Sequence, residues 1–294
     1  MLVLPGSSVP KLGLDIATEL KTELVAYEIR KFPDGEKYIK ISTDVKDQKV
    51  VVVQSVFGNP DSLLFEYAML VDAAYGAGAS EIVGVFPYLA YLRQDERFKQ
   101  GEALSSKVVA SLIQSTRTSK VFVVDPHLHR IHDINELFDI PAFNVTAMFK
   151  MALFAKSEFK LKDPLVVAPD EEAEQWASKV ASILGIEYLV AKKVRFGDED
   201  VNIDIKDQNL KGRDILLVDD IISTGGTLSK ISASLEKIGV NRIFALVTHG
   251  LFASGAYDRI KSSGIEEIVT TDTVPNKYSL VGIAPVIAKA LQGD

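Results

Sequence analysis

Short apolar runs alternate with stretches of helical periodicity along most of the chain. Each run is rich in valine, isoleucine or leucine, and a polar or glycine-containing turn follows it. Apolar runs separated by helices in this way are typical of parallel β-strands that are covered on both faces. The expected strands cover residues 50–56, 81–86, 120–124, 165–168, 186–190, 214–218, 242–248 and 267–270. The expected helices cover residues 61–75, 105–116, 172–184 and 227–238.

These elements form two successive series, which predict two α/β domains. The first series ends near Pro141 and Asn144, and the second begins after Met148. We therefore expect one domain over residues 1–146 and another over residues 147–294. A chain of 294 residues is long enough for both, since a domain typically has about 150 residues.

The composition excludes several classes of protein. Hydrophobic residues make up 47% of the chain, which is enough to bury a core and excludes a disordered protein. The net charge is -7, from 33 basic and 40 acidic side chains, so we expect neither nucleic acid nor a membrane as a partner. The chain has no cysteine, which excludes disulfides, thiolate metal sites and cysteine nucleophiles. With no secretory signal and no long apolar segment, a cytoplasmic protein is expected.

Residues 215–227, ILLVDDIISTGGT, carry the strongest signal for a ligand site. An apolar strand leads into Asp219 and Asp220 and then into a hydroxyl-rich loop that opens a helix. Such a loop presents backbone N–H groups and the positive end of a helix dipole to a phosphate, while the acids suit sugar hydroxyls or magnesium. Alternatively, Thr224 is only a helix cap and the glycines only form a tight turn. The adjacent acid pair favours a sugar-phosphate site that includes Ser223, Thr224, Gly225, Gly226 and Thr227.

The segment VDDIISTGGT resembles the phosphoribosyl-diphosphate-binding motif. The phosphoribosyltransferases share this motif with the ribose-phosphate diphosphokinases, so the motif alone does not distinguish the two families. Other segments of the chain do distinguish them, because they resemble the ATP-binding segments of the diphosphokinases.

The first of these segments is FPDGE, residues 32–36. On its own, this sequence indicates only a tight turn, because proline, aspartate and glycine favour turns. In the diphosphokinase family a matching FxDGE segment binds adenine, and it does so from a neighbouring subunit. The resemblance implies that Phe32 stacks on the base and that Asp34 and Glu36 meet its polar edge.

The second segment is PYLAYLRQDERF, residues 87–98, which resembles the family's PYxxYxRQD. Taken one at a time, arginines such as these are usually solvated surface residues. Two matched segments about sixty positions apart make coincidence a poor explanation. The resemblance implies that ATP is contacted by Arg93, Gln94, Asp95 and Arg97.

Residues 124–130, VDPHLHR, place an acid and two histidines in alternation at the end of a strand. On their own, Asp125, His127 and His129 suit a transition-metal site, because alternate strand residues point the same way. Histidines near strand ends also serve as simple hydrogen-bonding residues. The resemblance to the family's DxH implies that His127 contacts a magnesium-ATP complex, and it gives His129 no role.

Residues 167–170, VAPD, end another strand with an acid. The resemblance implies that Asp170 contacts metal and diphosphate. The chain departs here from the family's commoner pattern, because Glu171 and Glu172 stand where a small residue often follows. Two carboxylates beside a polyphosphate are repulsive unless they turn outward or meet metal.

Residues 192–195, KKVR, begin a polar segment. A basic run is often only a solvated face, and residues 202–213 fit either an edge hairpin or a mobile flap over a site. In the diphosphokinases a KxR pair on a catalytic loop neutralises charge on the transferring group. Lys193 and Arg195 match that spacing, and alternation on an extended strand sends both side chains to the same side.

The resemblance implies two similar doubly wound parallel-sheet domains of phosphoribosyltransferase type. It also implies transfer of the diphosphoryl group of ATP to the 1-hydroxyl of ribose 5-phosphate, giving 5-phosphoribosyl 1-diphosphate and AMP. Mg²⁺ is the implied cofactor, and a homo-oligomer with shared ATP sites is the implied assembly. Two alternatives are a phosphoribosyltransferase that uses this product and a non-catalytic relative that regulates a synthase. The ATP segments argue against the first, and the retained KxR pair and ribose loop argue against the second.

Overall fold

The computed structural model describes residues 1–128, 131, 133–196, 200–204 and 210–293, and for residues 192–196 and 200–204 it describes the backbone only. Two compact units make up the chain. The first comprises Met1–Thr146 together with Ile283–Asp294, and the second comprises Ala147–Gly282. Each unit has a central parallel sheet, which confirms the predicted α/β class. No helix within the described residues is long and apolar enough to cross a membrane.

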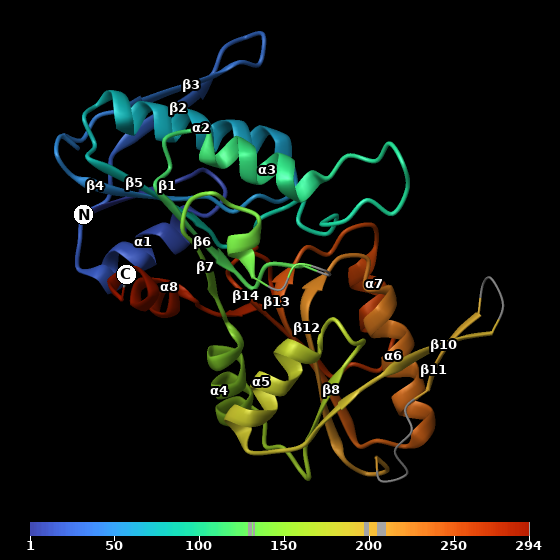
Figure 1. Cartoon of the computed structure of the whole chain (residues 1–294). Helices are drawn as coiled ribbons and strands as arrows, with labels where there is room; N and C mark the ends of the chain where they lie inside the picture. Colours follow the sequence, from blue (N-terminus) through green and yellow to red (C-terminus); the bar gives the residue numbers. More distant parts are fainter. Residues whose placement is uncertain (129–130, 132, 197–199, 205–209, 294) are drawn as a thin grey trace. The chain divides into compact units, whose positions relative to one another are not determined.

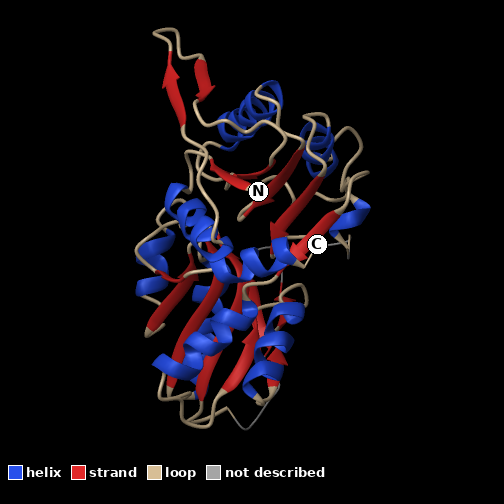
Figure 2. Cartoon of the chain, turned by 90° about the vertical axis from the view of Figure 1, so that its left-hand side faces the viewer, coloured by secondary structure: helices blue, strands red, loops and turns tan. Residues whose placement is uncertain are grey.

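The sheet of the first unit has five parallel strands in the order β1-β4-β5-β6-β7. In that order they cover Leu2–Pro5, Lys49–Val53, Glu81–Phe86, Lys120–Val124 and Ala142–Val145. The helices α2 (Pro60–Gly76) and α3 (Ser105–Gln114) lie on one face of this sheet (Figure 1). The helices α1 (Pro10–Leu20) and α8 (Ala284–Gln292) lie on the other face, and a short 3-10 helix covers Ile134–Glu136. A separate antiparallel hairpin, β2 (Tyr27–Lys31) and β3 (Lys37–Ile41), extends from the unit (Figures 1 and 2).

Strand β4 shows why these residues form a buried sheet. Lys49 is followed by four consecutive valines, all of them buried, and β-branched side chains favour strands. Gly84 in the neighbouring β5 makes room for α2, since a Cβ at this position would lie 2.5 Å from the hydroxyl oxygen of Tyr67. The Tyr67 hydroxyl is hydrogen-bonded to that of Thr118 at 2.7 Å. This close approach fixes α2 against the sheet.

The C-terminal helix belongs to the first unit, which corrects the expectation that residues 147–294 form one domain. α8 packs against α1, and its buried residues, among them Ile287 and Leu291, lie on one side of the helix. α1 has a buried stripe of its own that includes Ile16. The physical reason is that an amphipathic helix must cover its apolar stripe, and α8 does so on α1.

The sheet of the second unit has six parallel strands in the order β15-β14-β13-β12-β8-β9. In chain order β8, β9, β12, β13, β14 and β15 cover Leu165–Ala168, Tyr188–Val190, Asp214–Ile222, Arg242–Gly250, Glu267–Thr271 and Ser279–Val281. α4 (Met148–Glu158) and α5 (Glu174–Leu184) lie on one face, and α6 (Gly226–Ile238) and α7 (Ala256–Lys261) lie on the other (Figure 1). A separate antiparallel hairpin consists of β10 (Lys192–Phe196) and β11 (Asp200–Asp204).

The strands of this second sheet are covered on both faces. Ile215 and Leu217 of β12 belong to the same apolar core as Ile231 of α6. On β13, Phe244 stacks on Phe159, which follows α4, with 4.2 Å between the ring centres. Coverage on both faces explains why these strands are continuous apolar runs rather than alternating ones.

The expected strands at residues 81–86, 120–124 and 165–168 have the predicted bounds. β12 and β13 continue further than expected, to Ile222 and Gly250, because their pairing continues to those residues. The apolar pattern did not indicate β1, β7 and β15, which have only three or four residues each.

Candidate active site

The connection from β12 to α6 has the form of a phosphate-binding loop. β12 runs through Asp219 and Asp220, and α6 begins only four residues after the strand ends. Gly225 occupies the N-cap position in the left-handed conformation, with φ 73°, and no side chain caps the helix. Thr224 and Thr227 are exposed at this helix end. Its leading N–H groups can therefore bind a phosphate.

α7 supports this loop. The guanidinium of Arg259 donates a hydrogen bond to the carbonyl oxygen of Thr224. A Cβ on Gly225 would lie 2.6 Å from Cγ1 of Ile260, so the loop can approach α7 this closely only with glycine. The sequence reasoning did not identify Arg259, because no local pattern signals a partner 35 positions away.

Three carboxylates gather near the carboxyl ends of β8 and β12. Asp219 accepts a hydrogen bond from the backbone N–H of Asp220 at 2.9 Å, and Asp220 is fully buried. Burial raises the pKa of Asp219 well above its ordinary value, and the negative charges of Asp220 and Asp170 raise it further. β8 and β12 are adjacent parallel strands, which brings Asp170 to the other two acids. Hydroxyl donors suit such a cluster, although within the described residues its three side chains are not arranged as a ready-made metal site.

Asp170 also shapes the start of α5. Its Oδ1 accepts a hydrogen bond from the backbone N–H of Ala173 at 3.2 Å, just before that helix. Glu171 and Glu172 are both exposed. Their departure from the family's commoner pattern is therefore compatible with a polyphosphate site, since neither charge is buried beside Asp170.

A cavity of about 330 Å³ in the first unit brings together three of the residues expected to bind ATP. Arg93, Gln94 and His127 line it, together with Tyr88 and Tyr91. Arg93 is exposed, whereas Gln94 and His127 are half-buried. The residues come from the segments that follow β5 and β6, which are adjacent parallel strands. Their separation in sequence therefore becomes proximity at one sheet edge.

Asp95 and Arg97 do not line this cavity. Asp95 is buried, and its Oδ2 accepts a hydrogen bond from the backbone N–H of Ile131 at 3.1 Å. Arg97 is exposed, and its Nε donates to the carbonyl oxygen of Glu102 at 3.0 Å. Both contacts order the chain around the cavity, and direct contact of these two residues with ATP stays a prediction.

The FPDGE segment forms the turn of the β2–β3 hairpin. The N–H of Phe32 donates to the carbonyl oxygen of Glu36 at 2.8 Å, and that of Gly35 donates to the carbonyl oxygen of Phe32 at 2.9 Å. A carboxylate oxygen of Asp34 accepts from the N–H of Glu36 at 3.2 Å. Phe32 is exposed, with the guanidinium of Arg30 over its ring at 4.6 Å from the centre.

Lys193 and Arg195 lie on β10, where their backbones pair with Ile203 and Val201 of β11. Their side chains fall outside the described part of the structure, so their shared orientation stays a prediction. The hairpin forms its own two-stranded sheet. Within the described residues this favours an independent hairpin over an edge of the main sheet.

The transition-metal alternative of Asp125, His127 and His129 is not tested, because it includes a residue outside the described part of the chain. Among residues 1–128, 131, 133–191 and 210–293, no group of three or more histidine, aspartate or glutamate side chains is arranged to hold a metal ion. Asp125 is buried with a φ of 36°, while His129 falls outside the described residues. In the second unit, the buried His249 places Nδ1 2.8 Å from the hydroxyl of Thr273, a hydrogen bond inside the core.

Two family descriptions match the chain in succession. The N-terminal domain of ribose phosphate pyrophosphokinase matches residues 1–117, and the phosphoribosyl transferase domain matches residues 133–280. The second match ends before α8, the helix that packs with the first unit.

Curated relatives match the chain along its whole length. The ribose-phosphate pyrophosphokinase of Methanopyrus kandleri is 38% identical, over 99% of this chain and 99% of its own. Ribose-phosphate pyrophosphokinase 1 of Archaeoglobus fulgidus is 35% identical, over 99% of this chain and 100% of its own. The crystal structure of phosphoribosylpyrophosphate synthetase from Mycobacterium smegmatis is similar with a TM-score of 0.88 at 26% identity, covering 99% of this chain and 98% of that one.

Proposed function

The chain belongs to the ribose-phosphate pyrophosphokinase family, and from this premise we infer that it synthesises 5-phosphoribosyl 1-diphosphate from ATP and ribose 5-phosphate. The observation that carries the inference is 38% identity to such an enzyme along 99% of both chains. A phosphoribosyltransferase or a purely regulatory relative is not favoured, because the similar full-length proteins are named as pyrophosphokinases.

Residues 223–227 are proposed to hold the 5-phosphate of ribose 5-phosphate. The leading N–H groups of α6 would donate to the phosphate oxygens, and Arg259 would keep the loop in place through the carbonyl of Thr224. Asp219 and Asp220 would fix the ribose hydroxyls, directly or through magnesium. The sugar would then present its 1-hydroxyl to the β-phosphorus of ATP.

ATP is proposed to occupy the cavity beside Arg93, Gln94 and His127. Arginine and glutamine side chains are good donors to phosphate oxygens. Phe32 would stack on the adenine, with Asp34 and Glu36 at its polar edge. This assignment of the FPDGE turn rests on the resemblance and is supported by the exposure of Phe32, which is 39%.

The proposed reaction needs positioning and charge neutralisation rather than a covalent enzyme intermediate. The oxygen of the 1-hydroxyl bonds to the β-phosphorus, and the bond from that phosphorus to the bridging oxygen of the α-phosphate breaks. AMP leaves with that oxygen, and the proton of the hydroxyl is released. Lys193 and Arg195 would neutralise the charge that spreads over the transferring group.

Mg²⁺ is the proposed cofactor, and the residues present fit it. Carboxylate oxygens are ligands that Mg²⁺ prefers. Burial raises the pKa of Asp219, the charges of Asp220 and Asp170 raise it further, and a bound cation would offset that repulsion. Because Mg²⁺ is usually held by one or two carboxylates together with substrate phosphates, a preformed protein cage is not required. Asp170 would hold the ion, and His127 would contact the metal-ATP complex. The bound ion would neutralise part of the negative charge on the phosphates of ATP.

A homo-oligomer is the proposed assembly, with the FPDGE turn of one subunit completing the ATP site of its neighbour. We also propose a cytoplasmic location, where ATP and ribose 5-phosphate are both available.

The experiment is to mix the purified protein with Mg²⁺, ATP and ribose 5-phosphate and to separate the nucleotide products. AMP and 5-phosphoribosyl 1-diphosphate should appear in equal amounts. ADP as the main product would mean transfer of a single phosphoryl group and would contradict the proposal. Consumption of added 5-phosphoribosyl 1-diphosphate with a free base would indicate a phosphoribosyltransferase, and substrate binding without turnover would indicate a regulatory relative.

A further inference from the structure

Tyr91 has a backbone conformation that is unusual for a residue with a side chain. Its φ is 71°, in the left-handed region. A Cβ atom makes this region unfavourable, so a residue other than glycine stays there only where surrounding contacts enforce it. Such residues are concentrated at binding sites. Tyr91 fits this pattern, because it lines the cavity proposed for ATP together with Arg93, Gln94 and His127.

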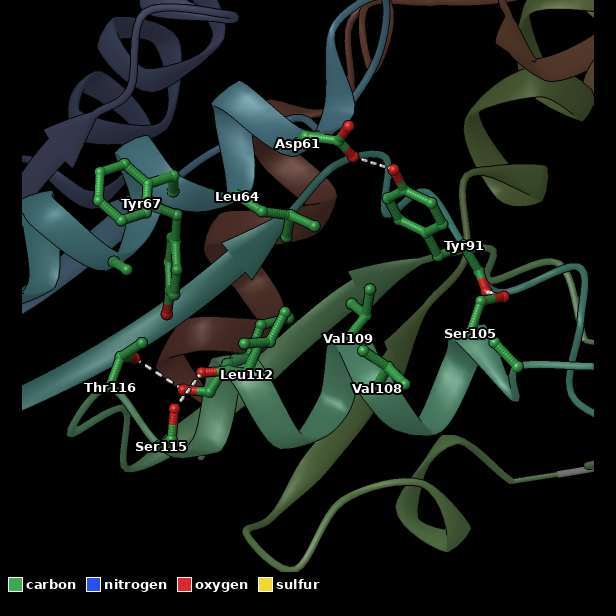
Figure 3. Close-up of a pocket in the computed structure, with 14 residues that line it drawn as sticks. Asp61, Leu64, Tyr67, Tyr91, Ser105, Val108, Val109, Leu112, Ser115 and Thr116 are labelled. Carbon is green, nitrogen blue, oxygen red and sulfur yellow. Dashed lines mark hydrogen bonds between the residues drawn. The ribbon is translucent and has the colours of Figure 1, made fainter. Parts of the chain in front are cut away.

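Two helices hold Tyr91 in this conformation. Its hydroxyl donates a hydrogen bond to the carboxylate of Asp61, in the first turn of α2. Its carbonyl oxygen accepts a hydrogen bond at 2.8 Å from the hydroxyl of Ser105, the first residue of α3. Figure 3 shows these three residues beside an open apolar groove between the two helices. Tyr91 is therefore tied through its side chain and through its backbone.

The hydroxyl of Tyr91 is a donor at neutral pH. The hydrogen bond to Asp61 raises the pKa of Tyr91 above its ordinary value of 10.0, and slight burial and the charge of Asp61 raise it further. A hydrogen bond to a charged acceptor is stronger than one between neutral groups. The bond to Asp61 is therefore well suited to fix the ring of Tyr91.

The chain on either side of Tyr91 is anchored as well. The N–H of Tyr88 donates to the hydroxyl of Ser55 at 2.9 Å, and the carbonyl oxygen of Tyr88 accepts from the N–H of Val56 at 2.7 Å. After the turn, the carbonyl oxygen of Gln94 accepts from the N–H of Ser106 at 3.3 Å. The backbone of this segment is thus set by the loop after β4 and by the start of α3.

The turn at Tyr91 sorts the next two side chains. Leu92 is 2% exposed and belongs to the apolar core of the first unit. Arg93 is exposed and lines the cavity. A different φ at Tyr91 would change the direction in which the chain leaves this residue, and with it the direction of the Arg93 side chain.

We propose that Tyr91 is a positioning residue for ATP, because its bonds to Asp61 and Ser105 keep the guanidinium of Arg93 directed into the cavity. Tyr91 acts through Arg93 and not through a contact of its own with ATP. Binding then requires less ordering of the loop and of the arginine side chain, which makes it tighter. The inference rests on the proposed function, since it takes ATP as the molecule that occupies the cavity.

The test compares ATP binding, measured by isothermal titration calorimetry with Mg²⁺ and without ribose 5-phosphate, with steady-state kinetics. Tyr91→Phe removes only the hydroxyl. It should raise the dissociation constant and the KM for ATP about three- to tenfold, the worth of one such hydrogen bond. The kcat and the KM for ribose 5-phosphate should change little. Asp61→Ala should have the same effect, whereas Asp61→Asn, which keeps an acceptor oxygen, should retain most of the affinity.

Double variants show whether these side chains act as one unit. Tyr91→Phe/Asp61→Ala should bind ATP no more weakly than either single variant, because both changes remove the same bond. In Arg93→Ala protein, the addition of Tyr91→Phe should change the dissociation constant for ATP less than about twofold. The full effect of Tyr91→Phe in that background would mean that Tyr91 contacts ATP itself, and the positioning role would be wrong.

Tyr75→Phe is the matched control, because it removes an exposed hydroxyl from the other end of α2, away from the residues that line the cavity. It should leave ATP binding unchanged, and thermal unfolding should confirm that all variants are folded. The proposal is overturned if Tyr91→Phe binds ATP like the wild type, even where its unfolding temperature falls.

The same measurements separate this proposal from the proposed reaction. If the wild type binds ATP but releases ADP rather than AMP, the proposed reaction fails, while the comparison of ATP affinities still decides the role of Tyr91. A wild type that binds no ATP would overturn both.

Discussion

Lys37 and Glu66 form a buried ion pair that ties the β2–β3 hairpin to α2. Nζ of Lys37 lies 2.7 Å from Oε2 of Glu66, and the two side chains are 11% and 2% exposed. Oε1 of Glu66 accepts further hydrogen bonds from the backbone N–H of Ser7 at 2.9 Å and from Nε2 of Gln54 at 3.1 Å. Because Lys37 directly follows the FPDGE turn, this network fixes the base of that turn to the body of the unit.

Replacing Lys37 with methionine should therefore lower the free energy of unfolding by about 3–5 kcal/mol, because Glu66 would keep a buried charge without its cation. Urea unfolding at neutral pH measures this loss. The double variant Lys37→Met/Glu66→Leu should recover much of it, since no charge is then left unpaired. A single variant as stable as the wild type would show that this pair does not hold the hairpin.

Asp214 provides a pH-dependent contribution to stability. Burial opposes its charged form, but hydrogen bonds from Arg242, from the backbone N–H of Lys162 and from Asn241 outweigh burial and lower its pKa below the ordinary value of 3.8. Oδ2 of Asp214 lies 2.6 Å from Nη2 of Arg242. As the pH falls, Asp214 is therefore protonated at a higher pH in the unfolded chain than in the folded protein. The stabilisation that ionised Asp214 provides is complete above its pKa in the unfolded chain, and it is lost as the pH falls through its lower pKa in the folded protein.

Asp214→Asn should accordingly lower the free energy of unfolding at pH 7 by about 1–3 kcal/mol. The difference from the wild type should narrow below the ordinary pKa of 3.8. Urea unfolding of both proteins at a series of pH values measures the effect. A difference that stays constant into the acid range would contradict the lowered pKa.

Gly225→Ala should disturb the proposed phosphate loop. The added Cβ would meet Cγ1 of Ile260 at 2.6 Å, and the backbone φ of 73° disfavours alanine. We expect a loss of about 1–3 kcal/mol of stability and a raised KM for ribose 5-phosphate. Gly226→Ala is the control for stability, because there the nearest atom, Oγ1 of Thr224, is at an ordinary contact distance of 3.7 Å. Equal losses of stability in Gly225→Ala and Gly226→Ala would argue against a clash with Ile260 as the cause.

Asp220→Asn keeps the size of a fully buried side chain and removes its charge. If the acid pair binds ribose hydroxyls and magnesium, the KM for ribose 5-phosphate should rise while the KM for ATP stays nearly constant. Steady-state kinetics with each substrate varied in turn distinguishes the two effects. An unchanged KM for ribose 5-phosphate together with an unchanged kcat would remove Asp220 from the site.

Lys193→Ala and Arg195→Ala should each lower kcat by ~100-fold or more and change the KM for ATP little, because charge directed at the transition state is worth ~3 kcal/mol.

Subunit exchange between Lys193→Ala and Phe32→Ala proteins tests whether ATP sites are shared. Some mixed interfaces would combine an intact Phe32 with an intact Lys193, so activity should exceed the sum of the parents. No recovery despite demonstrated exchange would place the adenine pocket within one chain.

The sequence by itself determined the α/β class and the position of the proposed phosphate loop. Both follow from local patterns, because β12, which runs through Asp219 and Asp220, and the TGGT turn lie close together in the chain. The same holds for the FPDGE turn, whose hydrogen bonds join residues at most four positions apart. Residue type and spacing are sufficient where the interacting groups are neighbours in sequence.

Only the tertiary structure decided which distant residues meet. Asp170 reaches Asp219 because β8 and β12 pair in parallel, and Arg93 and His127 line one cavity because β5 and β6 do. The return of α8 to α1, the support of Thr224 by Arg259 and the pairing of Lys37 with Glu66 have no local signature either. The physical reason is that these contacts depend on strand order and helix packing, which the whole chain determines through burial of its apolar surface.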